Sequence, residues 1–82
     1  MARHLTLYTR PGCTLCQEVL EDLQLLAGEL DLEIATVDIG RDPALLERYQ
    51  CLIPVVDVDD GPVLVAPVSI RRLRQVLAIP AP

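Results

Sequence analysis

Two cysteines separated by two residues, in Arg10-Pro11-Gly12-Cys13-Thr14-Leu15-Cys16, place the strongest constraint on how this chain folds. Residues 5–9, before them, alternate like a β-strand. The apolar residues after them recur at helical spacing: Val19, Leu20, Leu23, Leu26, Ala27 and Leu30. Pro11-Gly12 predicts a turn between the two patterns. We therefore expect both thiols on or just before the first turn of a helix.

A cysteine at the start of a helix is easily ionised, because the first backbone N–H groups lack carbonyl partners and the helix dipole adds partial positive charge. The thiolate is the reactive form. We expect Cys13, nearer the helix start and more exposed, to attack a disulfide, and Cys16, one turn on, to resolve the mixed disulfide. Arg10 can add positive charge near Cys13. The alternative is two ordinary half-buried cysteines, but a CxxC between a strand and a helix favours the redox pair.

The rest of the chain predicts a βαβ unit followed by a helix, a hairpin and a last helix. We expect a helix over residues 13–29, with Glu18, Glu21 and Asp22 on its solvent face, and a parallel strand over residues 32–39. Asp42 and Pro43 predict the cap and first position of a short second helix. Strands over 55–58 and 63–65 are joined by a tight turn at residues 59–61. Ser69 predicts the cap of a helix whose apolar residues point inward (Ile70, Leu73, Val76 and Leu77), followed by a frayed tail at 80–82.

Because the chain has no Trp or Phe, and Tyr8 and Tyr49 are its two aromatic residues, we expect an aliphatic core without aromatic anchors. Arg71, Arg72 and Arg74 are expected on a solvated face of the last helix. The 82 residues predict a single domain over 1–82.

The element order β-α-β-α-β-β-α, with a CxxC opening the first helix, resembles the thioredoxin fold. The opening over residues 5–16 is similar to that of small bacterial glutaredoxin-like proteins. The resemblance implies an α/β fold with a four-stranded mixed sheet flanked by three helices. It also implies a cis Ile53–Pro54 bond facing the CxxC loop, where the backbone of Ile53 pairs with an extended peptide or with glutathione. The alternative is a trans proline that opens a strand at a sheet edge.

Two segments depart from the pattern of glutaredoxins that use glutathione. Those proteins typically carry Thr-Val-Pro and a Gly-Gly turn, whereas this chain has Leu52-Ile53-Pro54 and, over residues 65–69, no glycine pair. The Ser69 hydroxyl and the nearby helix start, with Arg71 or Arg72, can still meet a carboxylate. Glutathione therefore remains a possible co-substrate, and we expect no tightly bound cofactor.

Charge and cysteine count restrict the class of partner. The net charge of −5 argues against nucleic acid and against anionic membranes. Three cysteines, without a visible signal peptide or a membrane-spanning run, indicate a cytoplasmic protein rather than a secreted disulfide scaffold. We expect a monomer that acts on protein disulfides or glutathione mixed disulfides, with glutathione or a reductase as electron source.

Two further functions compete with the oxidoreductase. One is a thiolate metal or iron–sulfur carrier using Cys13, Cys16 and Cys51, although the spacing encodes no closed site in one chain, so we expect no metal site. The other is a thioredoxin-fold interaction module with little redox turnover.

Cys51 can be a third thiol near the pair or a small apolar filler at a helix end, and we favour the filler. His4 is expected at the opposite end of the first strand, ~15 Å or more from the thiols, and is a poor ligand or base.

Overall fold

The computed structural model describes residues 3–59 and 61–77 and confirms the expected order of strands and helices. The elements are β1 (Arg3–Thr9), α1 (Thr14–Ala27), β2 (Leu32–Asp38), the 3₁₀ turn η1 (Ile39–Arg41), α2 (Pro43–Tyr49), β3 (Val55–Val58), β4 (Val63–Leu64) and α3 (Ile70–Val76). Asp60 of the expected turn and the expected tail at 80–82 lie outside the described residues.

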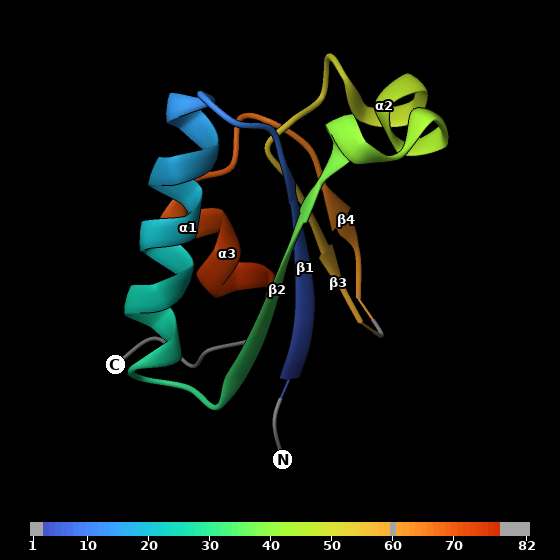
Figure 1. The fold of residues 1–82 in the computed structure, drawn as a ribbon. Helices are drawn as coiled ribbons and strands as arrows, with labels where there is room; N and C mark the ends of the chain where they lie inside the picture. Colours follow the sequence, from blue (N-terminus) through green and yellow to red (C-terminus); the bar gives the residue numbers. More distant parts are fainter. Residues whose placement is uncertain (1–2, 60, 78–82) are drawn as a thin grey trace.

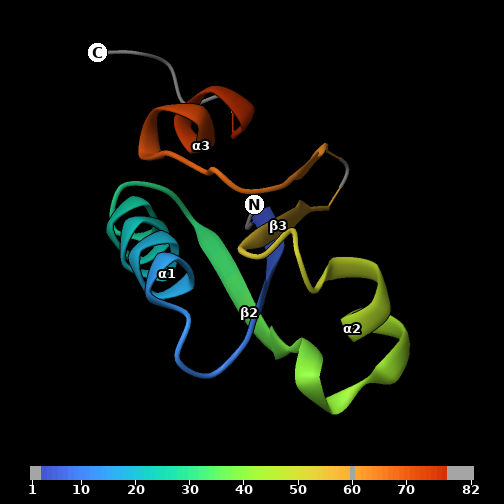
Figure 2. The same cartoon turned by 90° about the horizontal axis from the view of Figure 1, so that it is seen from above.

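The strands form one mixed sheet in the order β2-β1-β3-β4. β1 and β2 are parallel, as the βαβ pattern predicts, and β3 is antiparallel to both β1 and β4. Helices α1 and α3 cover one face of the sheet and α2 lies on the other (Figures 1 and 2). This is the thioredoxin-like α/β arrangement that the resemblance implies. No helix within residues 3–59 and 61–77 is long and apolar enough to cross a membrane.

The larger part of the core lies between the sheet and the pair α1 and α3. Alternation along β1 turns Leu5 and Leu7 toward this face, where both are buried. Helix α1 meets them with Val19, Leu23 and Leu26, which share one stripe because helical neighbours recur three and four residues apart. All the buried side chains of this cluster are aliphatic, as expected.

The smaller cluster under α2 contradicts the expectation of a core without aromatic anchors. Tyr49 is 9% exposed and packs with Ile39 and Val55. Its ring stacks on that of Tyr8 with the centroids 4.8 Å apart. Because α2 is only seven residues long, one large ring from it covers sheet surface that several aliphatic side chains would otherwise have to cover.

Side-chain caps begin the last two helices at the expected residues. The Asp42 carboxylate accepts the backbone N–H of Ala44 at 2.9 Å, and Pro43 takes the first helical position. The Ser69 hydroxyl accepts the N–H of Arg72 at 3.1 Å. Both contacts satisfy N–H groups that would otherwise lack partners at a helix start.

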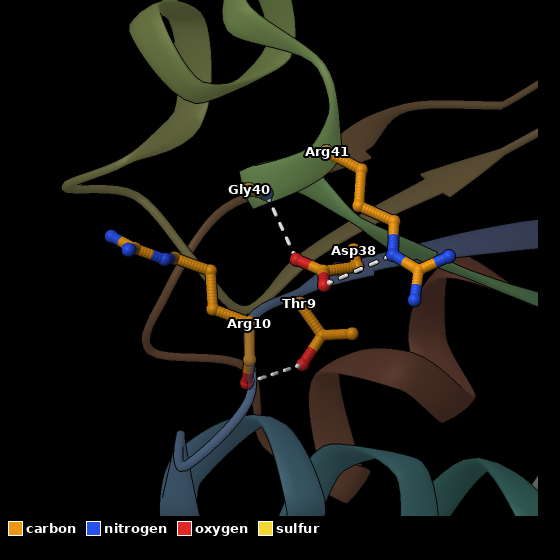
Figure 3. Close-up of polar contacts among 5 residues, drawn as sticks. All are labelled: Thr9, Arg10, Asp38, Gly40 and Arg41. Carbon is orange, nitrogen blue, oxygen red and sulfur yellow. Dashed lines mark hydrogen bonds and ion pairs between the residues drawn. The ribbon is translucent and has the colours of Figure 1, made fainter.

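Two strands are shorter than the sequence predicts. β2 ends at Asp38, because its carboxylate accepts the Gly40 N–H at 2.9 Å and turns the chain into η1, which buries Ile39 (Figure 3). β4 ends at Leu64 rather than at residue 65, and the next backbone N–H, that of Ala66, bonds the Leu52 carbonyl at 3.1 Å.

One of the three α3 arginines is not a freely solvated charge. Arg74 donates to both carboxylate oxygens of Glu29, at 2.7 and 3.1 Å, and so ties α3 to the end of α1. This hydrogen-bonded pair lowers the pKa of Glu29. Arg71 and Arg72 are exposed, as expected.

Candidate redox site

A tight turn carries the chain from β1 to Cys13. The Cys13 N–H donates to the Arg10 carbonyl at 3.3 Å, and Gly12 between them has φ +80°. Proline at the second position and a positive-φ glycine at the third are the residues of a type II turn. Pro11-Gly12 therefore makes the predicted turn, and the turn sets where α1 begins.

Cys13 is the residue that caps α1, so the helix starts at Thr14, one residue later than predicted. Its Sγ accepts the backbone N–H of Cys16 at 3.2 Å, and its carbonyl accepts the N–H of Gln17 at 3.1 Å. A hydrogen bond to sulfur favours the charged form of a thiol, as does the positive end of the helix dipole. The position supplies both of the influences that the sequence predicted for Cys13.

The two thiols of the CxxC differ in exposure. Cys13 is partly exposed, whereas Cys16 is 2% exposed. Their Cα atoms are 5.2 Å apart and the two Sγ atoms lie at disulfide-bonding distance. The arrangement presents one sulfur to solvent and keeps the other behind it, within reach.

Arg10 contacts Cys13 through its backbone, while its side chain is exposed. In Figure 3 the Arg10 guanidinium extends away from the side chains of Thr9 and Asp38. The ion pair at this end of the sheet is instead that of Asp38 with Arg41, at 3.8 Å. Residues 9–14, which include Arg10 and Cys13, line a shallow hollow of about 350 Å³ together with Gln17.

A second hollow, which we call the dithiol groove, includes Leu15, the residue before Cys16, and measures about 250 Å³; neither cysteine of the CxxC lines it. One wall is α1, with Leu15, Glu18, Val19 and Asp22. The opposite wall is Pro54 and residues 66–68. The structure thus brings Pro54 to the segment that contains the cysteines, although about forty residues separate them in sequence.

The prolines of the opposite wall follow cis peptide bonds, at Ile53–Pro54 and at Ala66–Pro67. The Ile53 N–H already donates to the Tyr49 carbonyl at 3.2 Å. The Ile53 backbone has two groups that can pair with a substrate, the N–H and the carbonyl. The N–H is therefore already bonded within the protein, and the carbonyl is the group left for a substrate.

Ser69 is not part of the groove wall, since the last residue lining the groove from this segment is Val68. Its hydroxyl oxygen serves as the cap of α3. The charged side chains that do line the groove are Glu18 and Asp22, which the sequence placed on an ordinary solvent face. The signal that identifies them is their spacing: residues 15, 18, 19 and 22 form one helical stripe that continues from the CxxC.

The remaining candidates lie away from this site or outside any cluster. Cys51 is exposed, which contradicts its interpretation as a small apolar filler at a helix end. His4 pairs with Glu33 at 2.9 Å at the start of β1, whereas Cys13 follows the end of that strand. Within the part of the chain that the structure describes, no three His, Cys, Asp or Glu side chains gather as metal ligands.

Comparison with known proteins identifies relatives over nearly the whole chain. Residues 4–78 match the family Glutaredoxin-like domain (DUF836). The X-ray structure of target protein XcR50 from X. campestris has 36% sequence identity and a TM-score of 0.78, over 94% of this chain and 99% of that one. The solution NMR structure of protein Ne2328 from Nitrosomonas europaea has 26% identity and a TM-score of 0.74, over 93% and 87%. A comparison with curated proteins finds no match. The chain, with its CxxC at the start of α1, therefore belongs to the glutaredoxin-like domain family.

Proposed function

We propose that this glutaredoxin-like protein is a thiol–disulfide oxidoreductase in which Cys13 attacks and Cys16 resolves. The observation that carries the proposal is the Cys13 sulfur at the cap of α1, which accepts the Cys16 N–H while the Cys16 sulfur lies behind it at bonding distance. A capped, partly exposed thiolate is a nucleophile, and a shielded thiol beside it reacts only after the first has done so.

The proposed reaction transfers two electrons to the substrate disulfide. The Cys13 thiolate attacks one substrate sulfur, forms a mixed disulfide and releases the other substrate sulfur as a thiolate. The Cys16 thiol loses its proton to solvent and its thiolate attacks the Cys13 sulfur, which releases the second substrate thiolate and leaves a Cys13–Cys16 disulfide. Two molecules of glutathione, which leave as glutathione disulfide, or one dithiol reductase, which becomes a disulfide, return the two electrons by the same exchange.

The groups proposed to bind substrate are Arg10, Ile53, Pro54 and Ser69. Arg10 supplies exposed positive charge in the hollow that includes Cys13, and Pro54 forms part of the dithiol groove. The carbonyl of Ile53 accepts a backbone N–H of an extended substrate. Ser69 is retained as a candidate for a carboxylate, since its hydroxyl proton is still available while its oxygen caps α3. We propose that the protein works as a monomer in the cytoplasm, where reducing thiols regenerate it.

The test is turnover of a small glutathione mixed disulfide and of a protein disulfide, with electrons from glutathione or from a thioredoxin-type reductase. We expect Cys13→Ser to abolish turnover of both substrates. In a single turnover without external thiol, Cys16→Ser should retain attack but accumulate the mixed disulfide, which mass spectrometry detects. Cys51→Ser is the matched control, because it removes an exposed thiol that lies outside the pair.

The thiol chemistry is tested separately by alkylation across pH. In the reduced protein, Cys13 should react at lower pH than Cys16, with Cys51 as an internal exposed thiol. If Cys13 alkylates with the pH profile of an ordinary cysteine and no substrate turns over, the oxidoreductase is ruled out and the thioredoxin-fold interaction module takes its place.

A further inference from the structure

The dithiol groove carries a charge pattern that bears on which disulfides this site accepts. Its walls are mainly apolar, from Leu15, Val19, Pro54 and Pro67. The charged residues among those lining it are Glu18 and Asp22. In the part of the chain that the structure describes, the ion pairs are those of Glu33, Asp38 and Glu29, so neither groove carboxylate is neutralised by a basic side chain there.

The groove includes one residue of the CxxC, Leu15, and no cysteine. Leu15 lies between the two cysteines in sequence and also lines the groove, so a chain joined to Cys13 by a mixed disulfide can place a neighbouring side chain there. A volume of about 250 Å³ accommodates a side chain or two rather than a folded element. Arg10, the basic residue near Cys13 in sequence, lines the other hollow and not this groove.

We propose that the groove selects disulfides of polypeptides that carry an apolar residue and a lysine or arginine beside the reacting cysteine. The inference rests on the proposed oxidoreductase and names its substrate class. The apolar walls take the stem of a long basic side chain, while Glu18 and Asp22 meet its charge. Glutathione carries two carboxylates and one ammonium group, so it brings net negative charge to an acidic groove and is the poorer substrate.

The experiment compares three short peptides, each with a cysteine blocked as a pyridyl disulfide. The peptides differ only in the two residues next to that cysteine, which are Leu-Lys, Leu-Gln or Leu-Glu. The reduced protein is mixed with each at low ionic strength, and the rate of thiopyridone release is measured in a single turnover. We expect the Lys peptide to react about three- to tenfold faster than the Glu peptide, the range for one or two exposed charge contacts. High salt should reduce the ratio toward one.

Matched variants separate the groove from the overall negative charge. Glu18→Gln with Asp22→Asn should reduce the Lys-to-Glu ratio by at least half. Glu21→Gln removes a carboxylate that is exposed on the same helix but does not line the groove, and it should keep the wild-type ratio. Equal rates for the three peptides, or equal loss of the ratio in the Glu21 variant, overturn the groove as the source of selectivity.

A binding measurement keeps this inference distinct from the proposed function. Peptides in which serine replaces the blocked cysteine are titrated into the protein, and the amide shifts of α1, Ala66 and Val68 are followed by NMR. If no peptide disulfide reacts faster with wild type than with Cys13→Ser, the oxidoreductase fails. The groove inference then stands if the Lys peptide shifts these amides at lower concentration than the Glu peptide, and falls if the two titrate alike.

Discussion

Replacing Gly12 with alanine should destabilise the protein through the backbone alone. Gly12 has φ +80°, which an L-residue with a Cβ disfavours by about 1–2 kcal/mol. A Cβ built at this position meets nothing within 4 Å, so no steric overlap adds to this conformational free-energy cost. For a domain of this size the expected loss corresponds to a fall in Tm of about 4–16 °C.

The measurement is equilibrium denaturation of the reduced protein, so that the Cys13–Cys16 bond does not contribute to the free energy of unfolding. Gly12→Asn is the matched control, because asparagine enters the left-handed region at lower cost than alanine. We expect asparagine to fall between glycine and alanine. Since the turn also positions the cap of α1, Gly12→Ala should in addition slow alkylation of Cys13 at neutral pH.

Two results would refute this reasoning. If Gly12→Ala unfolds within about 0.5 kcal/mol of wild type, the size of an ordinary surface substitution, the positive φ is not required for folding. If asparagine is as harmful as alanine, the loss comes from added bulk rather than from backbone conformation.

Four further predictions follow from packing, capping and titration. Leu23→Ala should cost about 2–5 kcal/mol in denaturant unfolding because Leu23 is 0% exposed, whereas Leu25→Ala, at a 60% exposed position on the same helix, should cost less than about 0.5 kcal/mol. Asp42→Ala should cost about 1 kcal/mol by removing the α2 cap, and Asp42→Asn should retain most of it. Burial, and to a smaller extent the charge of Asp57, raises the pKa of Tyr8 above 10.0. The stability that Tyr8 contributes is therefore present below pH 10 and lost as pH rises through the pKa of the folded state. Tyrosinate absorbance of wild type and Tyr8→Phe checks this. The hydrogen bond from Arg74 lowers the pKa of Glu29 below 4.5. The stability that Glu29 contributes is therefore present above pH 4.5 and lost as pH falls through the pKa of the folded state. In Glu29→Gln the denaturation midpoint should lose this part of its acid dependence.

The features that the sequence predicted correctly are governed by neighbours in the chain. Asp42 and Ser69 cap helices because each side chain reaches an N–H two or three residues ahead. Pro11-Gly12 makes its turn for the same local reason, and Leu23 is buried because helical periodicity sets which face of α1 meets the sheet. The parallel pairing of β1 and β2 follows from the length of the crossover between them.

The features that the sequence did not reveal depend on which distant segments meet. The stacking of Tyr8 on Tyr49 joins β1 to α2, and no local pattern indicates it. The bond from the Ile53 N–H to the Tyr49 carbonyl removes a donor that the resemblance offered to a substrate. Cys51 and its neighbour Leu52, which follow α2, are both exposed, whereas the sequence favoured an apolar filler at a helix end.

The same distinction, between features set by neighbours in the chain and features set by distant segments, applies to the candidate site. The geometry from which we propose that Cys13 is reactive lies within residues 10–17, where a turn and a helix cap place one sulfur at the start of α1, so that geometry was predictable. The proposed selectivity depends on the dithiol groove, where α1 faces Pro54 and residues 66–68, segments some forty to fifty residues apart in sequence. Substitutions at 66–68 should therefore change which disulfides react while leaving the pH profile of Cys13 alkylation in place. Substitutions at Pro11 or Gly12 should change that profile for every substrate alike, because they act on the sulfur before any substrate is bound.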